Sequence, residues 1–219
     1  MARILYDLSG TNGLRFSPYC WRVKLSLAQK NLEYKTVAVG FTEKWKLEFS
    51  GQNLLPVLDD NGTIVCDSWK IAEYLEATYP NAPELFRGAE GKLLAKLTTE
   101  WINGQHKELL SFFILDVLNK LDSKDQEYFR RSREKRYGIS LEDVQLGREE
   151  RIAEFREVKL AALRAHLADR PFIARGGPGY GDFAVFGTFQ WARLVSKFDL
   201  LDPSDPIYDW RWRMISRFC

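Results

Sequence analysis

The chain has 219 residues, of which 45% are hydrophobic and 14% aromatic, so it has ample material for a folded core and is not a disordered protein. Its 32 Lys and Arg residues are balanced by 30 Asp and Glu residues, which leaves a formal charge of +2. No region concentrates basic charge without acidic neighbours, and this argues against a nucleic-acid-binding protein.

The first part of the chain alternates between strand and helix patterns. The predicted elements are, in order, a strand at 2–8, a helix at 18–30, a strand at 34–39, strands at 54–58 and 63–66 joined by an Asn-Gly turn, and a helix after Asp67 and Ser68. A β-α-β unit requires parallel neighbours, and the hairpin adds an antiparallel pair. We therefore expect a mixed four-stranded sheet with helices on its faces.

The pattern changes after residues 79–83, where two prolines in a short stretch indicate a stiff linker. Beyond it, apolar residues recur at helical spacing in three segments, 91–118, 147–169 and 183–198, and the last should be the most buried. The sequence thus predicts an α/β domain at 1–82 and an all-helical domain at 90–219.

The hexapeptide at residues 17–22 opens the first predicted helix directly after a strand and a Gly-bearing loop. Ser17 would be the N-cap and Pro18 the first helical residue, which has no N–H to lose. The amides of Tyr19 and Cys20 would then point outward at the positive end of the helix dipole, where an anion binds well. Alone, this hexapeptide favours a purely structural cap.

Pro56 interrupts a strand-like run, because proline donates no ladder hydrogen bond. If the Leu55–Pro56 bond were cis, backbone groups of Leu55 or Val57 would face an opening and could pair with an extended peptide. An edge-strand proline without a ligand is the alternative. Asp67 and Ser68 begin another helix and offer a second carboxylate site. Together with Ser17, these features suit a small acidic peptide that carries a thiol.

These residues resemble the cytosolic glutathione S-transferases, and the resemblance spans essentially the whole chain. It implies a thioredoxin-like N-terminal domain with a mixed four-stranded sheet, followed by a helical-bundle C-terminal domain. The strongest likeness is to the bacterial β-etherase-type transferases, which cleave lignin-derived β-aryl ethers, and to related fungal serine-type transferases. The segments that carry this likeness are 17–22, 67–75, 132–134 and 141–148.

Residues 179–182 are similar to the helix-capping box of that family, which usually begins with Ser or Thr. Gly179 departs from this pattern, so only the Asp182 cap carries over, and its role there is folding.

The resemblance also implies roles for individual residues. Ser17 is the catalytic residue and stabilises the glutathione thiolate. Leu55 and Val57, on either side of a cis Pro56, bind the cysteinyl backbone of glutathione. Asp67 and Ser68 bind its γ-glutamyl end. Lowering a thiol pKa from about 8.5 by roughly two units needs about 2.7 kcal/mol. One hydrogen bond to a charged group (about 1.5–3 kcal/mol) and a helix N-terminus (about 0.3–1 kcal/mol) can supply this without a metal or a general base.

The expected reaction is attack of the thiolate on an electrophilic carbon with loss of a leaving group, which for a β-aryl ether beside a ketone is a phenolate. The acceptor, a small hydrophobic electrophile, should bind in a pocket between the two domains. The candidates to line it are Tyr19, Trp101, Phe112 and Phe113, with ordinary core packing as the alternative for each. The resemblance further implies a homodimer.

Two other functions stay open. Residues 17–20 look like a glutaredoxin motif without its first cysteine, so a Cys20-dependent glutathione reductase or peroxidase is one alternative. Cys20 is one turn into the helix, however, and fits a part-buried structural thiol better. A non-catalytic glutathione-binding or regulatory protein is the other alternative. The charged stretch at 123–151 is interpreted as surface structure rather than an insertion over the pocket mouth.

The remaining features concern compartment and metals. Cys20, Cys66 and Cys219 are widely spaced and form no disulfide framework, the N-terminus lacks a signal pattern, and no apolar run reaches membrane length. We expect a reducing, cytoplasmic location without membrane contact. His106 and His166 are far apart, without a surrounding ligand pattern, so no metal site is expected.

Overall fold

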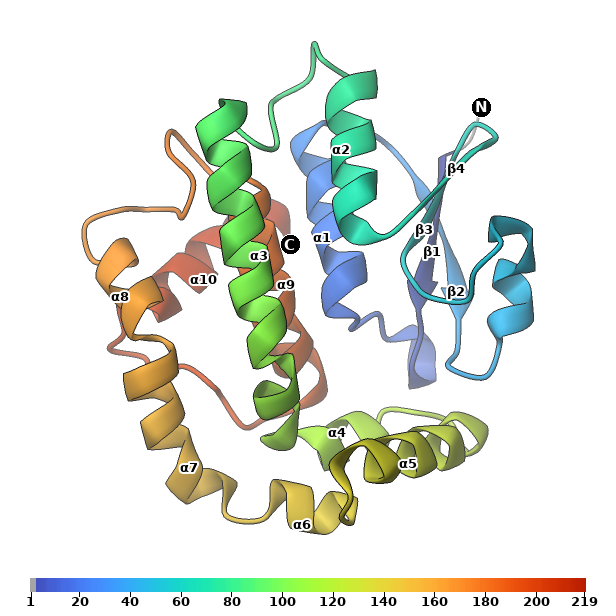
Figure 1. Ribbon diagram of the computed structural model, residues 1–219, viewed down its shortest axis with the longest axis vertical. Helices are drawn as coiled ribbons and strands as arrows, with labels where there is room; N and C mark the ends of the chain where they lie inside the picture. Colours follow the sequence, from blue (N-terminus) through green and yellow to red (C-terminus); the bar gives the residue numbers. More distant parts are fainter. Residues whose placement is uncertain (1–2) are drawn as a thin grey trace.

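A four-stranded sheet in the order β2-β1-β3-β4 forms one side of the computed structural model, which describes residues 3–219 (Figure 1). The strands are β1 (Arg3–Leu8), β2 (Lys35–Val39), β3 (Val57–Asp60) and β4 (Thr63–Cys66). β1 pairs parallel with β2 and antiparallel with β3, and β3 pairs antiparallel with β4. The predicted mixed sheet is confirmed; Ala2, the first residue of the predicted strand, lies outside the described residues.

The hairpin between β3 and β4 turns at Asn61 and Gly62, whose φ angles are 56° and 94°. Two consecutive positive φ angles are what a two-residue hairpin of this type needs, and Asn-Gly supplies them with little strain. The predicted hairpin is therefore present for the expected reason.

The two faces of the sheet follow the two-residue alternation of its strands. Leu5 of β1 pairs with Leu58 of β3, and both belong to the main core with side chains of α1 (Pro18–Gln29) and α2 (Ser68–Thr78). Val57, on the opposite face, packs with Val39 and with Leu47 of the short 3-10 helix Lys44–Ser50. The sheet is thus covered on both faces.

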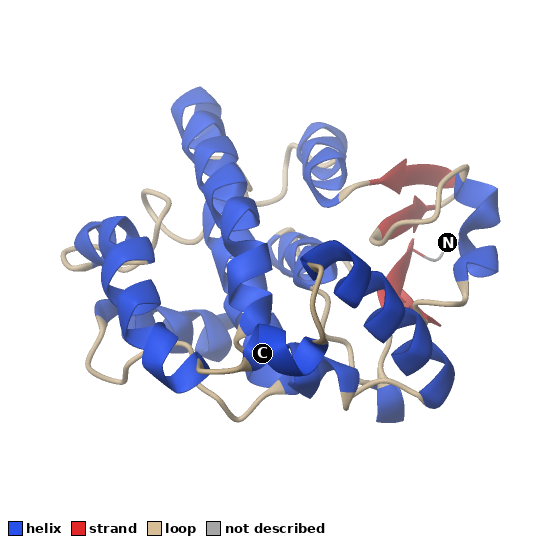
Figure 2. Cartoon of the chain, turned by 60° about the horizontal axis from the view of Figure 1, so that its bottom comes forward, coloured by secondary structure: helices blue, strands red, loops and turns tan. Residues whose placement is uncertain are grey.

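Beyond α2 the chain contains only helices, as Figure 2 shows. They are α3 (Gly88–Ser111), α4 (Ile114–Leu118), α5 (Ser123–Tyr137), α6 (Leu141–Gln145), α7 (Arg148–Glu154), a π-helical turn (Phe155–Lys159), α8 (Ala161–Leu167), α9 (Tyr180–Val195) and α10 (Pro206–Phe218). The fold class predicted from the sequence is confirmed. The exact division into 1–82 and 90–219 stays a prediction.

Two of the predicted helical segments are interrupted. The segment 91–118 breaks at Phe112 and Phe113, where Phe113 has a φ of −145° and both rings are buried. The segment 147–169 contains the π-helical turn Phe155–Lys159 between α7 and α8. Helical spacing of apolar residues continues through both breaks, so periodicity alone did not reveal them.

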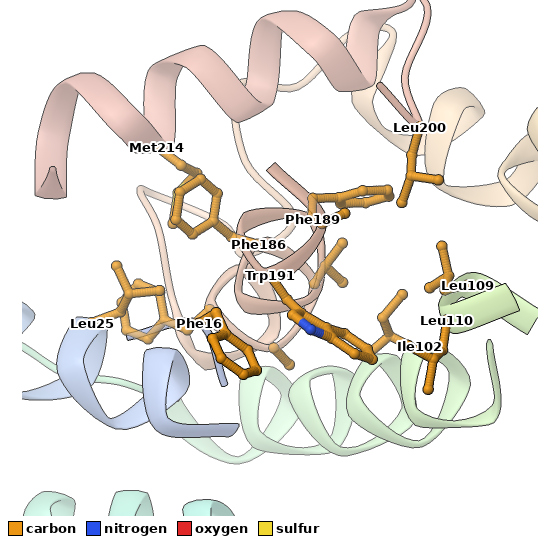
Figure 3. Close-up of a cluster of buried hydrophobic side chains, with 14 of the residues drawn as sticks. Phe16, Leu25, Ile102, Leu109, Leu110, Phe186, Phe189, Trp191, Leu200 and Met214 are labelled. Carbon is orange, nitrogen blue, oxygen red and sulfur yellow. The ribbon is translucent and has the colours of Figure 1, made fainter. Parts of the chain in front are cut away.

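Helix α9 lies at the centre of the helical part and is buried along nearly its whole length. Phe186, Phe189 and Trp191 of this helix belong to a cluster that also contains Phe16, just before α1, and Ile102 of α3 (Figure 3). The expectation that this segment is the most buried helix is confirmed. Because α9 contacts both α1 and α3, it joins the sheet to the helical part.

Gly187 allows α9 to approach the first turn of α1 closely. A Cβ atom at this position would lie 2.6 Å from the carbonyl oxygen of Pro18, which is backbone and cannot rotate away. We expect Gly187→Ala to lower the free energy of unfolding by about 1–3 kcal/mol, as overpacking does. Chemical denaturation measures this change.

Gly104 in α3 is the matched control, because a Cβ atom there would have no neighbour within 4 Å. Gly104→Ala should raise the free energy of unfolding by about 0.5–1 kcal/mol through helix propensity. Equal stability of the two variants would contradict the close approach of α9 to α1.

No helix among residues 3–219 is both long enough and apolar enough to cross a membrane.

Candidate functional site

A cavity of about 390 Å³ lies between the sheet side of the molecule and helices α3, α4, α5 and α9. Ser17, Tyr19 and Leu55, all singled out from the sequence, line it together. The opposite wall comes from the helical part and consists of Asn103, His106, Lys107, Leu110, Val117, Tyr128, Phe129, Arg133, Arg136 and Trp191. The two halves of the chain therefore form one cavity.

Ser17 is the N-cap of α1, as the sequence predicts, and Pro18 is the first helical residue. Its Oγ accepts a hydrogen bond from the backbone N–H of Cys20 at 3.3 Å, and the residue is 4% exposed. A hydroxyl oxygen that accepts in this way can still donate its own hydrogen to one acceptor. An anion placed there would also meet the positive end of the α1 dipole.

The Leu55–Pro56 peptide bond is cis, and Val57 then begins β3. Leu55 lines the cavity that Ser17 also lines. Pro56 and Val57 are buried, and neither residue lines the cavity.

Asp67 is the N-cap of α2, and its Oδ1 accepts hydrogen bonds from the backbone N–H groups of Trp69 (3.0 Å) and Lys70 (3.1 Å). Asp67 is exposed, Ser68 is buried, and neither lines the cavity. Burial lowers the pKa of Arg22 in α1, while the charge of Asp67 is among those that oppose this shift. Asp67 is therefore close enough to α1 for its charge to act there.

Tyr19, His106 and Thr188 form a hydrogen-bonded chain beside Ser17. Thr188 donates its only hydroxyl hydrogen to the carbonyl oxygen of Ala184 at 3.2 Å, so the 2.8 Å contact with His106 is donated by Nε2 of the imidazole. The other ring nitrogen, Nδ1, then accepts from the Tyr19 hydroxyl at 3.0 Å. The guanidinium of Arg22 also lies 4.7 Å from the centre of the Tyr19 ring. Tyr19 is therefore positioned by two contacts, one at its hydroxyl with His106 and one at its ring with Arg22.

Burial lowers the pKa of His106 to about 3, with smaller contributions from the positive charges of Arg22 and Arg136. An unfolded chain would protonate this histidine near pH 6.5, so acidification favours unfolding. Between pH 7 and 5, the free energy of unfolding should therefore fall by about 2 kcal/mol because of this group. His106→Gln should remove this part of the pH dependence, and urea denaturation at pH 7 and 5 compares the two proteins. Parallel losses in both would contradict a neutral buried imidazole.

Three of the four side chains expected to line the acceptor pocket do not line it. Phe112 and Phe113 lie in the core, with Phe113 packed edge-on against Trp191 at 4.8 Å between ring centres. Trp101 is half-buried on α3, outside the cavity wall. The break after α3 turns the two phenylalanines toward the core, and Tyr19 is the one of the four candidates that lines the cavity.

Helix α5 forms part of the cavity wall, so the interpretation of residues 123–151 as surface structure alone is wrong. Figure 1 shows α4 and α5 beside the open end of the sheet. The Asp125 carboxylate fixes α5 there by accepting from the N–H of Phe41 (2.7 Å) and from the N–H and Oγ1 of Thr42 (2.8 and 2.7 Å). The alternative, an insertion over the pocket mouth, agrees better with the place of α5 in the cavity wall.

The sequence contained one signal for this wall. Tyr128 and Phe129 stand out as adjacent aromatic residues in a strongly charged helix, and both line the cavity. Two aromatic side chains on one turn are not expected in a fully solvated helix, so they indicate that this part of the helix contacts other apolar groups. Phe41 and Trp191 also line the cavity, but nothing in their local sequence separates them from core residues.

Cys20 is fully buried and does not line the cavity. Burial raises the pKa of its thiol well above the ordinary value, and the negative charge of Asp7 raises it further. A thiol held protonated in this way is a poor nucleophile. Cys20 therefore fits the structural role that its position in the helix suggested.

A thioredoxin-like sheet followed by a helical part, with a serine capping the first helix in the cavity between them, defines a class of glutathione-dependent proteins. Residues 12–83 match the model of the glutathione S-transferase N-terminal domain, and residues 94–202 match that of the C-terminal domain. The chain belongs to the glutathione S-transferase family.

The chain is also similar to individual proteins. A maleylacetoacetate isomerase from Dictyostelium discoideum is 28% identical over 120 residues, 50% of this chain and 55% of that protein, so the match spans about half the length of this relative. The structure of glutathione transferase GSTFuA2 from Phanerochaete chrysosporium has a TM-score of 0.87 at 23% identity and covers 100% of this chain and 99% of its own. The β-etherase LigF from Sphingobium sp. strain SYK-6 has a TM-score of 0.68 at 19% identity, covering 98% and 95%. At these identities the structural matches establish the fold.

Proposed function

We propose that this chain is a glutathione transferase in which the Ser17 hydroxyl stabilises the glutathione thiolate. The observation that carries the proposal is the geometry of Ser17 in the cavity wall, where its oxygen accepts from Cys20 N–H and its hydroxyl can still donate one hydrogen bond. A sulfur anion in this place receives that hydrogen bond and the field of the α1 N-terminus.

We propose the remainder of the glutathione site from the resemblance to the family. The backbone of Leu55 and Val57 on either side of cis Pro56 binds the cysteinyl part of glutathione, and Leu55 already lines the cavity with Ser17. Asp67 and Ser68 at the start of α2 bind the γ-glutamyl end, and the influence of Asp67 on Arg22 supports its nearness to α1.

In the proposed reaction the thiolate sulfur attacks an electrophilic carbon, and the leaving group departs with the bonding electron pair. For a β-aryl ether next to a ketone, the new bond is C–S and the product is a phenolate. The sequence likeness to β-etherase-type transferases and the fold shared with LigF support this substrate as the first to test. Tyr19 lines the cavity and is the proposed acceptor contact.

The test is an assay of glutathione consumption with identified products, using β-aryl ether ketones, chloronitroarenes and quinones as acceptors. Retention on immobilised glutathione, measured in parallel, reports binding. We expect retention and thioether formation with at least one acceptor. Retention without turnover of any acceptor would instead favour the non-catalytic glutathione-binding or regulatory protein.

The Cys20→Ala variant tests the reductase or peroxidase alternative. Because the Cys20 thiol is buried and protonated, we expect thioether formation and any disulfide or peroxide reduction to be unchanged in this variant. Loss of activity in a variant that unfolds with the wild-type denaturation midpoint would favour the cysteine-dependent mechanism.

We further propose a homodimer in the cytoplasm. Leu93 and Leu97, one turn apart on α3, are 62% and 61% exposed, and exposed apolar side chains of this size favour an interface. Free Cys20, Cys66 and Cys219 fit a reducing compartment. Light scattering of the purified protein tests the dimer, and a monomer at micromolar concentration would contradict it.

A further inference from the structure

The cavity wall carries positive charge without negative charge. Lys44, Lys107, Arg133 and Arg136 line it, and no Asp or Glu from residues 3–219 does. This contrasts with the chain as a whole, in which acidic and basic residues are nearly equal in number. The imbalance is therefore local to the cavity.

Arg133 is half-buried, whereas Lys107 and Arg136 are exposed. The Arg133 guanidinium lies 4.8 Å from the ring centre of Phe129 and 5.8 Å from that of Phe41, and its Nη1 donates to the Ser132 hydroxyl at 3.0 Å. Its Nε is buried and has no hydrogen-bond partner within the described chain. Burial lowers the pKa of Arg133. A cation in such surroundings is costly unless an anion compensates it.

Carboxylates of α5 form their contacts with groups other than Arg133. Asp125 accepts from Phe41 and Thr42. Arg130, one turn before Arg133, pairs with Glu134 and with Glu142, each at 2.9 Å. None of the ion pairs in the part of the chain that the structure describes involves Arg133, Arg136 or Lys107. The cavity-facing cations of α3 and α5 are thus left without a protein counter-ion.

Trp191 adds a neutral donor to the same wall. Its side chain is buried, and its indole Nε1 has no acceptor among residues 3–219. Two buried N–H groups, on Trp191 and Arg133, are therefore unsatisfied in residues that line one cavity. Buried donors normally find an acceptor, and these two have none within the described chain.

We propose that the cavity takes aromatic acceptors that carry a carboxylate, with Arg133 as the residue that binds the carboxylate. The aromatic side chains Phe41, Phe129 and Trp191 enclose the ring of such a molecule, and Arg136 and Lys107 strengthen its attraction to the site. Arg133, Arg136 and Lys107 lie on α3 and α5, whereas Lys44 and the proposed glutathione contacts lie on the sheet side. We therefore assign Arg133, Arg136 and Lys107 to the binding of the acceptor and not of glutathione. The catalytic consequence rests on the proposed transferase function, but the binding of the anion does not.

Equilibrium binding of two unreactive probes tests the proposal directly. The probes are nitrobenzoate and its neutral methyl ester, titrated by isothermal calorimetry against the protein with saturating glutathione. We expect the acid to bind about 10- to 100-fold more tightly than the ester, the effect of one charge-assisted hydrogen bond. Arg133→Gln should remove this preference while leaving the dissociation constant of glutathione unchanged.

Arg131→Gln is the matched control, because Arg131 is an exposed arginine of α5 that does not line the cavity. It should keep the wild-type preference. Arg136→Gln is the second variant, expected to reduce the preference only in part, and it keeps the test decisive if Arg133→Gln does not fold.

Three results would overturn the proposal. Equal affinity of the wild type for acid and ester would mean that the cavity takes neutral acceptors. Loss of glutathione affinity in Arg133→Gln, with nitrobenzoate unaffected, would assign this cation to a glutathione carboxylate. An equal loss of preference in Arg131→Gln would indicate a general effect of surface charge.

A kinetic comparison separates this proposal from the proposed function. With chloronitrobenzoate and its methyl ester, the glutathione thiolate forms a C–S bond and chloride leaves with the bonding pair. Arg133→Gln should raise the ratio of KM for the acid to KM for the ester, whereas Arg131→Gln should leave this ratio unchanged. If neither compound is converted while the binding preference persists, the transferase function fails and the anion site stands.

Discussion

Replacing Ser17 with alanine lowers kcat/KM for glutathione-dependent displacement by about 10- to 100-fold, the loss expected from one hydrogen bond to a charged sulfur. The variant keeps the α1 dipole and the other proposed glutathione contacts, so glutathione should still bind. Because the proposed chemistry depends on the fraction of bound thiolate, the loss should be largest near neutral pH and shrink at alkaline pH, where the thiol ionises unaided. Initial rates with a chloronitroarene across this pH range measure it.

Two further variants separate the chemistry of Ser17 from its role as a helix cap. Ser17→Gly also lacks the hydroxyl, but glycine at an N-cap costs only a few tenths of a kcal/mol. It should therefore lose as much activity as Ser17→Ala while remaining more stable. Ser17→Thr keeps a hydroxyl and should recover most of the rate. If Ser17→Ala and the wild type turn over at the same rate, Ser17 is only a cap.

Replacing Asp182 with alanine should cost about 3–5 kcal/mol of folding free energy, a large part of the stability of a typical domain. This fully buried carboxylate accepts hydrogen bonds from four donors, which are Ile173 N–H (2.7 Å), Ala174 N–H (3.0 Å), Gly179 N–H (3.1 Å) and Trp210 Nε1–H (2.9 Å). Alanine would leave all four without a partner in an apolar core. Urea denaturation measures the loss.

Asp209→Ala is the control for the Asp182 variant, because Asp209 lies exposed in the first turn of α10. Its removal should cost no more than about 1 kcal/mol. Activity per folded molecule should be unchanged in both variants, since neither residue lines the cavity. A small stability loss for Asp182→Ala would mean that the four donors find other partners, and the assignment of Asp182 to folding would then be wrong.

The parts of the fold that the sequence predicted correctly depend on local chemistry. Ser17 and Asp67 cap helices because a short polar side chain can reach the first free N–H groups, and Asn61-Gly62 turns because both residues tolerate positive φ. Asp182 could be identified in the same way, although Gly179 lacks the hydroxyl of the usual capping box. Such signals lie within a few residues of the element they shape.

The wall of the acceptor pocket could not be predicted in this way, because it is formed by residues distant in sequence. From the sequence, Phe112 and Phe113 are candidates for the cavity wall with core packing as the alternative, and only the break after α3 places them in the core. From the sequence, Arg133 belongs to a charged stretch that is interpreted as surface structure. Only the position of α5, fixed by Asp125, brings it to the cavity. Periodicity reports which face of a helix is apolar, but not what that helix packs against.

The central claim, that Ser17 stabilises the thiolate, is tested most directly by the pKa of glutathione bound to the protein. The ultraviolet absorbance of the thiolate, followed against pH in the wild type and in Ser17→Ala, gives this pKa without any acceptor substrate. We predict that the wild type lowers the thiol pKa from about 8.5 by roughly two units, and that Ser17→Ala reverses about one to two units of that shift. The same pKa in both proteins would contradict the account.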